Sequence, residues 1–120
     1  MLFDFHSTLV DQGSSELWLE IACERVKLDP RDYMDLVPKL NSIVEFARIE
    51  DPHHKRDLSG AAHEEIFTRL LGDFTEEPLT SALYSSITQA WFPYEDTIPV
   101  LDALREQGIT TAIISNIAID

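Results

Sequence analysis

Two short stretches at opposite ends of the chain carry the residues whose types suit chemistry. The first, MLFDFHSTLV, places Asp4 directly after an apolar stub, and His6 and Thr8 follow at intervals of two residues. The second, ITTAIISNIAID, ends a β-branched run at Ser115 and Asn116. A carboxylate can act as a nucleophile or a metal ligand, and hydroxyl groups can hold phosphate oxygens. The two stretches are therefore candidates for one site.

These residues meet only if both stretches are neighbouring strands of one parallel sheet. Both runs are short and apolar on both faces, which is typical of buried parallel strands. Ligands of an open parallel sheet collect outside the carboxyl ends of the strands, where Asp4 and the pair Ser115–Asn116 would converge. Such a site suits phosphoryl transfer, in which a carboxylate attacks phosphorus and a hydroxyl holds non-bridging oxygens. A divalent cation would neutralise the charge that repels the nucleophile.

A helical block separates the two strands. From about residue 14 to residue 91, apolar residues recur at helical spacing. Residues that cap, restart or end helices occur along this part of the chain: Ser14 or Ser15, Asp29 and Ser59 as N-caps, Pro38 as a kink or restart, Pro78 as a helix start, and Gly72 after a helix end. We expect residues 5–13 to form a loop and FPYEDT to form a turn. A short amphipathic helix ended by Gly108 and a final strand at ITTAII should follow.

The two end stretches resemble motifs of the haloacid dehalogenase (HAD) superfamily. LFDFHSTLVD resembles the first motif, in which apolar residues lead into Asp-x-Asp-x-Thr, and TTAIISN resembles the second, an apolar strand ending in Ser or Thr and commonly followed by Asn. FPYEDTIPVLDALREQGITTAIISN is similar to the stretch that leads into the second motif in subfamily I members with a helical cap. The resemblance implies an α/β fold: a HAD-like Rossmannoid parallel sheet from residues 1–13 and 92–120, incomplete here, with an α-helical cap inserted over residues 14–91.

The resemblance also implies a role for each matching residue. Asp4 resembles the nucleophile, which also ligates Mg²⁺, and the backbone carbonyl of His6 would be the second metal contact. Thr8 matches the hydrogen-bonding Thr of the first motif, Ser115 the phosphate-binding hydroxyl and Asn116 a substrate-orienting neighbour. The implied activity is Mg²⁺-dependent hydrolysis of a small phosphorylated metabolite through an aspartyl-phosphate intermediate.

Two departures from the family pattern leave alternatives open. His6 occupies the position of the usual acid/base Asp, although an imidazole with a pKa of about 6.5 suits proton transfer near neutrality. A dehalogenase-like hydrolase with a non-phosphate substrate is therefore one alternative. Only four residues follow Asn116, which leaves no room for the third and fourth motifs, a Lys or Arg and an acidic pair. We interpret the chain as truncated, which makes a non-catalytic remnant or interaction module the other alternative.

The composition of the chain indicates which classes of partner and which cellular compartment to expect. The 120-residue chain is 44% hydrophobic, as in a globular domain, and its net charge of -13 disfavours nucleic acid and anionic membranes. The one cysteine, Cys23, permits no intrachain disulfide, and no apolar run reaches the roughly 18 residues of a membrane span. We expect a cytoplasmic protein with a small phosphorylated substrate. Exposed sheet edges predict self-association, without fixing an oligomeric state.

Other residue types with potential chemistry are expected to be structural. His53 and His54 fall in a polar stretch that predicts a solvated loop. His63 and Glu64 fall in the first turn of a predicted helix, where a surface position is expected and a position facing the active-site crevice is the alternative. Cys23 is expected to be buried and inert. The aromatic residues are expected in the core, with a substrate pocket as the alternative: Trp18, Trp91 and Phe92.

Overall fold

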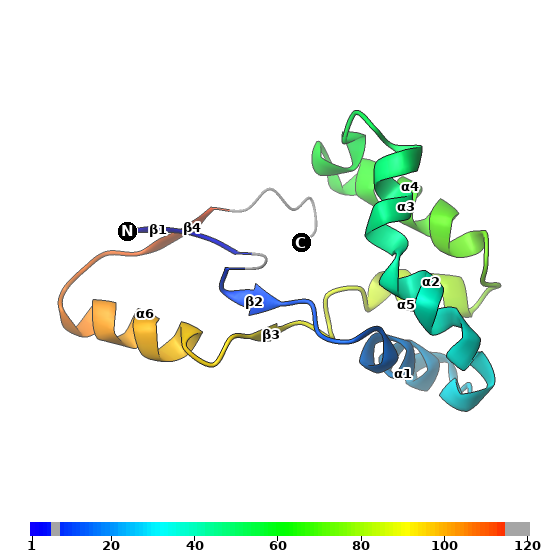
Figure 1. Ribbon diagram of the computed structural model, residues 1–120, viewed down its shortest axis with the longest axis horizontal. Helices are drawn as coiled ribbons and strands as arrows, with labels where there is room; N and C mark the ends of the chain where they lie inside the picture. The colour runs from blue at the N-terminus through cyan, green and yellow to red at the C-terminus, as the bar shows by residue number, and fades with distance from the viewer. Residues whose placement is uncertain (6–7, 115–120) are drawn as a thin grey trace. The chain divides into compact units, whose positions relative to one another are not determined.

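The computed structural model describes residues 1–5 and 8–114 of a mixed α/β chain that is mostly helical (Figure 1). Two compact units are present, and the chain crosses between them at residues 13/14 and 90/91. We call residues 14–90 the helical unit and residues 1–13 with 91–114 the α/β unit. Their identification as a HAD-like cap and core stays a prediction. No helix among the described residues is long and apolar enough to cross a membrane.

The helical unit consists of five α-helices and two 3₁₀ segments. They are α1 (Ser15–Val26), η1 (Pro30–Leu36), α2 (Val37–Asn41), α3 (Ile43–Glu50), η2 (Lys55–Asp57), α4 (Gly60–Gly72) and α5 (Leu79–Ser85). The three predicted N-caps are confirmed, and Ser14 rather than Ser15 is the first of them, because Ser15 is the first residue of α1. Side-chain oxygens of Ser14, Asp29 and Ser59 accept the N–H groups of Leu17, Arg31 and Ala62, respectively. These polar side chains satisfy N–H groups that the first helical turn leaves unpaired.

Of three helix boundaries predicted from the sequence, one is confirmed and two are wrong. Pro38 lies in the first turn of α2, so the predicted restart is confirmed. The prediction for Gly72 is wrong, because it is the last residue of α4. The helix predicted up to residue 91 ends much earlier, at Ser85. There the hydroxyls of Ser85 and Ser86 donate to the carbonyl of Ala82 at 3.1 and 2.7 Å, and such local bonds compete with helix continuation.

The helical unit has a continuous apolar core. Its fully buried members include Leu19, Leu71 and Leu83, contributed by α1, α4 and α5. The indole Nε1 of Trp18 donates to the carbonyl of Leu83 at 2.9 Å, which ties α1 to α5. Cys23 lies in the same core, and burial raises the pKa of its thiol. The predictions that Trp18 and Cys23 are core residues are therefore confirmed.

The α/β unit contains two small sheets and one helix. Strands β1 (Leu2–Asp4) and β4 (Ala112–Ile114) pair in parallel, and they lie side by side in Figure 1 although they come from opposite ends of the chain. Strands β2 (Val10–Asp11) and β3 (Phe92–Pro93) pair antiparallel. Helix α6 (Thr97–Glu106) precedes β4.

The pairing of β2 with β3 corrects two predictions from the sequence. Residues 5–13 were expected to form only a loop and FPYEDT only a turn, yet each contributes a short strand. The carbonyl of Leu9 explains the pairing, because it accepts the N–H of Tyr94 at 3.2 Å and the hydroxyl of Thr97 at 2.7 Å. These bonds join segments far apart in the sequence, so no local pattern predicts them.

Candidate active site

The predicted neighbours β1 and β4 are paired, and their carboxyl ends coincide. The register matches Leu2 with Ala112, Phe3 with Ile113 and Asp4 with Ile114. Asp4 and Ile114 are the last residues of their strands, and Ser115 directly follows Ile114 in the sequence. The register thus brings the Asp4 end of one motif beside the end of the strand that leads into the other.

Three of the predicted site residues lie outside the described residues: His6, Ser115 and Asn116. Asp4 and Thr8 are described, and both are exposed. Their roles as nucleophile and hydrogen-bonding residue are tested by nothing in the structure and stay predictions.

The Asp4 carboxylate is oriented by its own backbone. Its Oδ1 accepts the N–H of Phe5 at 2.8 Å, and its Oδ2 accepts no hydrogen bond from any residue that the structure describes. The chain then turns around the Phe5 carbonyl, which accepts the N–H groups of Thr8, Leu9 and Val10 at 3.4, 2.9 and 3.2 Å. The carboxylate of Asp4 is exposed at the end of β1.

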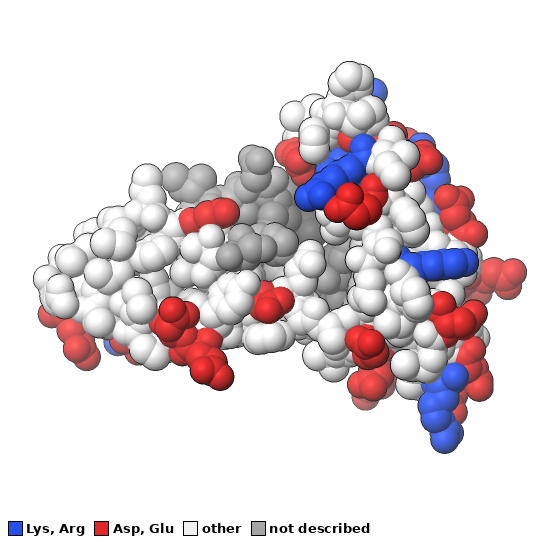
Figure 2. All heavy atoms as spheres, viewed as in Figure 1, with Lys and Arg blue, Asp and Glu red and all other residues white. Residues whose placement is uncertain are grey.

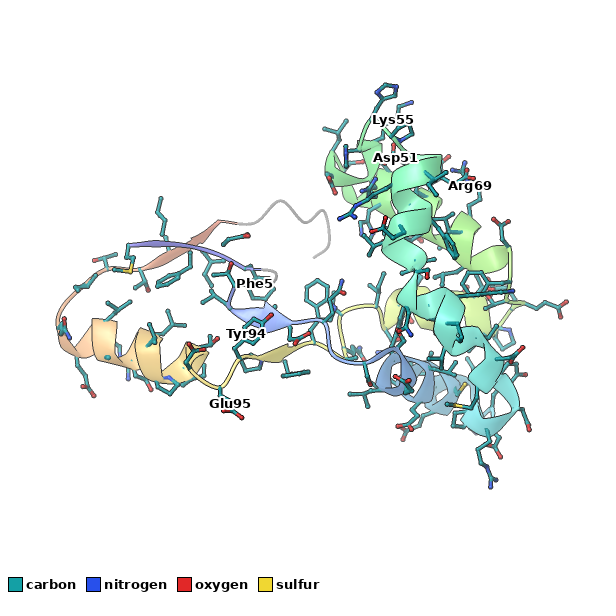
Figure 3. All side chains as sticks on the ribbon, viewed as in Figure 1. Phe5, Asp51, Lys55, Arg69, Tyr94 and Glu95 are labelled. Atoms are coloured by element: carbon teal, nitrogen blue, oxygen red, sulfur yellow. The ribbon has the colours of Figure 1, made fainter. Side chains whose placement is uncertain are left out.

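The loop after β1 is held by the β2–β3 ribbon. Leu9 and Thr97 are buried, and the bond from the Thr97 hydroxyl to the Leu9 carbonyl links the loop to the start of α6. The rings of Phe5 and Trp91 lie 6.3 Å apart between centroids, at 45° (Phe5 is labelled in Figure 3). Trp91 is half-buried and Phe92 is exposed, so the core position predicted for Phe92 is wrong. Backbone bonds and one aromatic pair thus position the segment that follows Asp4.

Among the described residues, the Asp4 carboxylate is the one predicted metal ligand at the carboxyl end of the parallel sheet. Carboxylate oxygen is a preferred donor for Mg²⁺, so Asp4 suits the ion as a single ligand. No group of three or more His, Cys, Asp or Glu side chains able to hold a metal is found within residues 1–5 and 8–114. The second predicted ligand, the carbonyl of His6, lies outside these ranges.

The described part of the α/β unit, which carries Asp4, is acidic. The described part of the α/β unit has Arg105 as its one Lys or Arg, and that residue pairs with Asp102 at 3.2 Å. The acidic residues of the unit are Asp4, Asp11, Glu95, Asp96, Asp102 and Glu106. Figure 2 shows acidic side chains on an otherwise mainly uncharged surface of this unit. A phosphorylated substrate therefore requires added positive charge at the site.

His63 in the helical unit departs from its predicted surface position. It is 7% exposed, and its Nδ1 lies 2.9 Å from the hydroxyl oxygen of Tyr84, while its ring lies 4.5 Å from that of Phe67. Burial lowers the pKa of His63; the charge of Asp57 opposes this effect, and that of Arg56 adds to it. The spacing of His63 to Ile66, Phe67 and Leu70, at i+3, i+4 and i+7, was the sequence signal for a core position.

A buried ion pair in the helical unit was also missed in the sequence. Asp51 and Arg56 are 4% and 7% exposed, and Nη1 of Arg56 lies 3.1 Å from Oδ2 of Asp51 (Asp51 and Lys55 are labelled in Figure 3). Burial raises the pKa of Asp51, but bonds from the Arg56 and Lys55 N–H groups and the Arg56 guanidinium outweigh it and bring the pKa below its usual value. His53 and His54 are exposed, as predicted.

These polar groups in the helical unit explain local structure rather than the predicted chemistry. The Asp51 carboxylate accepts the backbone N–H groups of Lys55 and Arg56 at 2.9 and 3.0 Å, which fixes the turn between α3 and η2.

Comparison of the chain with models of protein families, with curated protein sequences and with solved structures finds no match.

Proposed function

We propose that the chain is a HAD-like hydrolase, by its motifs a Mg²⁺-dependent phosphatase of a small phosphorylated metabolite, with Asp4 as the nucleophile. The observation that supports this proposal is the parallel register of Asp4 with Ile114. It aligns the carboxyl ends of the two strands that carry the motif-like stretches, and ligand sites of parallel sheets form at such an edge.

The proposed chemistry uses the residues of the two motifs. A carboxylate oxygen of Asp4 attacks phosphorus, the bond from phosphorus to the leaving oxygen breaks, and the leaving oxygen takes a proton from the His6 imidazolium. Water then gives a proton to the His6 imidazole as it attacks phosphorus, the bond from phosphorus to Asp4 breaks, and inorganic phosphate leaves. The Ser115 hydroxyl and the Asn116 amide would hold the phosphoryl oxygens.

Mg²⁺ belongs to the proposal as the source of positive charge that the acidic unit lacks. The Asp4 carboxylate and the His6 carbonyl would hold the ion, which would neutralise the charge between phosphate and nucleophile. The exposed position of Asp4 and its unshared Oδ2 are compatible with this role.

Hydrolysis of para-nitrophenyl phosphate by the full chain, with and without Mg²⁺, tests the proposal. Asp4→Asn is expected to abolish activity, because an amide oxygen is a far weaker nucleophile. Asp96→Asn is the matched control, since Asp96 is an exposed carboxylate of the same unit whose side chain makes no capping hydrogen bond, and it should keep full activity. Absence of Mg²⁺-dependent activity in folded protein, or equal activity in Asp4→Asn, would reject the phosphatase.

A non-catalytic interaction module is the second candidate, and the exposure of the parallel sheet favours it. Leu2 is 67% exposed and Ile113 is 56% exposed, although parallel sheets are normally covered on both faces. An interaction module would hydrolyse no para-nitrophenyl phosphate, with or without Asp4→Asn. A phosphatase would hydrolyse it, and Asp4→Asn would abolish the activity. The same assay therefore distinguishes the two candidates.

A further inference from the structure

A groove in the helical unit lies outside the proposed active site. It has a volume of about 330 Å³, which is within the range of small-molecule sites. Residues of α2, α3, α4 and the segment after α4 line it: Lys39, Phe46, Ile49, Glu50, Leu70, Asp73 and Phe74. All of these residues belong to one compact unit, so the groove is a property of that unit alone.

The walls of the groove are apolar and partly open to water. Leu70 is buried at 4% exposure, and the rings of Phe46 and Phe74 are half-buried. Ile49 is 76% exposed although it lines the same groove. A ligand with an apolar body would remove this surface from water, which is favourable by roughly 25 cal/mol per Å².

One wall of the groove already holds a cation. Nζ of Lys39 lies over the ring of Phe74, 5.5 Å from its centroid. Lys39 is exposed and makes no ion pair with a described residue, so the ring face is its one described partner. The negative face of an aromatic ring attracts a cation by about 0.5–1 kcal/mol at exposed sites and by more when the cation is desolvated. A less hydrated cation would therefore compete well for this position.

The carboxylates at the rim add to this preference. Asp73 is exposed and makes no ion pair with a described residue, and Glu50 shares its charge with Arg69 at 3.6 Å, where both side chains are half-exposed (Arg69 is labelled in Figure 3). The net charge of -13 makes the surrounding potential negative. Once Lys39 is displaced, the ring face of Phe74 and the carboxylate of Asp73 suit a cation, and the apolar walls suit its body.

We propose that this groove binds an organic cation with an apolar body, such as an aryl or alkyl ammonium compound. The ammonium group takes the place of Lys39 over Phe74, near Asp73, and the apolar part covers Leu70 and Ile49. The Lys39 side chain moves into water. The proposal is independent of the phosphatase, because none of its residues belongs to the proposed active site.

Titration of the full chain with benzyltrimethylammonium, followed by amide NMR shifts, tests the proposal. Benzyl alcohol and phenylacetate serve as neutral and anionic probes of similar size. The cation is expected to bind about 3- to 10-fold more tightly than benzyl alcohol, with shifts confined to the groove, and phenylacetate least tightly. Equal binding of the three probes, or tightest binding of phenylacetate at Lys39, would overturn the proposal.

A substitution of Lys39 distinguishes a cation site from an anion site, because it should change their affinities in opposite directions. Lys39→Met removes the competing cation and should tighten binding of benzyltrimethylammonium, whereas an anion site would lose affinity. Lys27→Met is the matched control for net charge, since Lys27 is exposed and does not line the groove. Weaker cation binding in Lys39→Met would also overturn the proposal.

Two further variants test the partners of the cation. Asp73→Asn, an exposed change, should weaken binding about 2- to 5-fold, and Phe74→Leu about 3- to 10-fold. Unchanged affinity in Asp73→Asn and Phe74→Leu would contradict the assigned position of the ammonium group. Asp4→Asn should bind the probe as the unmodified chain does, so a failed phosphatase assay leaves this result standing.

Discussion

The helical unit and the α/β unit differ sharply in how much apolar surface they bury. Every α-helix of the helical unit contributes to one buried cluster that includes Leu19, Leu71 and Leu83. Among residues 1–5, 8–13 and 91–113 of the α/β unit, Leu9 and Thr97 alone are buried. The difference separates the part of the molecule that is stably packed from the part that carries the proposed chemistry.

The stability of the folded chain should reside mainly in the helical unit. Apolar burial is the main favourable term in folding, so the helical unit should determine global unfolding. The α/β unit relies on a two-stranded parallel sheet and a short ribbon, and two-stranded sheets are marginal alone. Its exposed Leu2, Ile98 and Ile113 offer surface for further packing. Asp4 is thus carried by the less stable unit, and its geometry depends on local hydrogen bonds.

The largest expected effect tests the core of the helical unit. Leu83→Ala should lower the free energy of unfolding by about 2–5 kcal/mol, because it leaves a cavity at a fully buried position. Ile98→Ala, at a residue of α6 that is 55% exposed, should change it by less than about 0.5 kcal/mol. Urea denaturation followed by circular dichroism measures both. Similar losses in the two variants would contradict the comparison.

Local sequence signals predicted much of the secondary structure. Ser14, Asp29 and Ser59 were identified as N-caps because capping involves residues only two or three positions apart. A parallel sheet was predicted from the apolar character of β1 and β4, with their adjacency as the condition for a shared site, and their parallel pairing meets that condition. The burial expected for these strands is wrong, because Leu2 is 67% exposed and Ile113 is 56% exposed. Local chemistry was sufficient for the caps alone.

Apart from the parallel sheet, the features that depend on distant contacts were not predicted. The β2–β3 ribbon is fixed by bonds to the Leu9 carbonyl from residues more than 80 positions later. His63 is buried because Tyr84 of α5 supplies a polar partner. The pair of Asp51 and Arg56 spans only five positions and was missed although it is local; Arg56 is buried because Asp51 neutralises it. None of these pairings follows from spacing alone, since loop lengths and helix packing decide which polar groups meet.

For the candidate site, the sequence predicted the position of Asp4 along its strand but not the orientation of its side chain. The place of Asp4 at the carboxyl end of a parallel strand follows from an apolar run that stops at a carboxylate. The orientation of its Oδ1 by the Phe5 N–H does not, because it depends on the turn that follows. The assignments of His6, Ser115 and Asn116 rest on their motif positions and stay predictions.

The buried ion pair gives the next largest expected effect within the helical unit. Arg56→Met removes the partner of a buried carboxylate and should lower Tm by roughly 10 °C or more. Arg31→Met breaks the solvent-exposed pair with Asp29 and should lower Tm by less than about 3 °C. Thermal unfolding at pH 7 compares them. Equal shifts would show that burial does not distinguish the two pairs.

His63 should make the stability of the helical unit depend on pH. The pKa of an unfolded histidine is about 6.5, and burial lowers that of His63 in the folded chain, so the unfolded chain binds the proton more readily. Its contribution is fully present above pH 6.5 and is lost as pH falls towards the folded pKa. The slope is at most about 1.4 kcal/mol per pH unit.

Denaturation between pH 7.5 and pH 5.5 measures this dependence. His63→Gln should flatten the loss of stability on acidification, because glutamine does not titrate. His53→Gln is the control, since His53 is exposed and should leave the dependence unchanged. An unaltered pH slope in His63→Gln would mean that other groups carry the dependence.

The smallest expected effect is confined to the α/β unit. Thr97→Val keeps the side-chain shape but removes the bond to the Leu9 carbonyl, which still accepts the Tyr94 N–H. The cost should be about 1 kcal/mol, seen as roughly 5-fold faster hydrogen exchange at the Tyr94 amide. Thr68→Val, in α4, should leave that amide unchanged. If Thr97→Val also lowered the free energy of global unfolding by the same amount, the α/β unit would not open separately. The contrast between a packed helical unit and a locally held α/β unit would then fail.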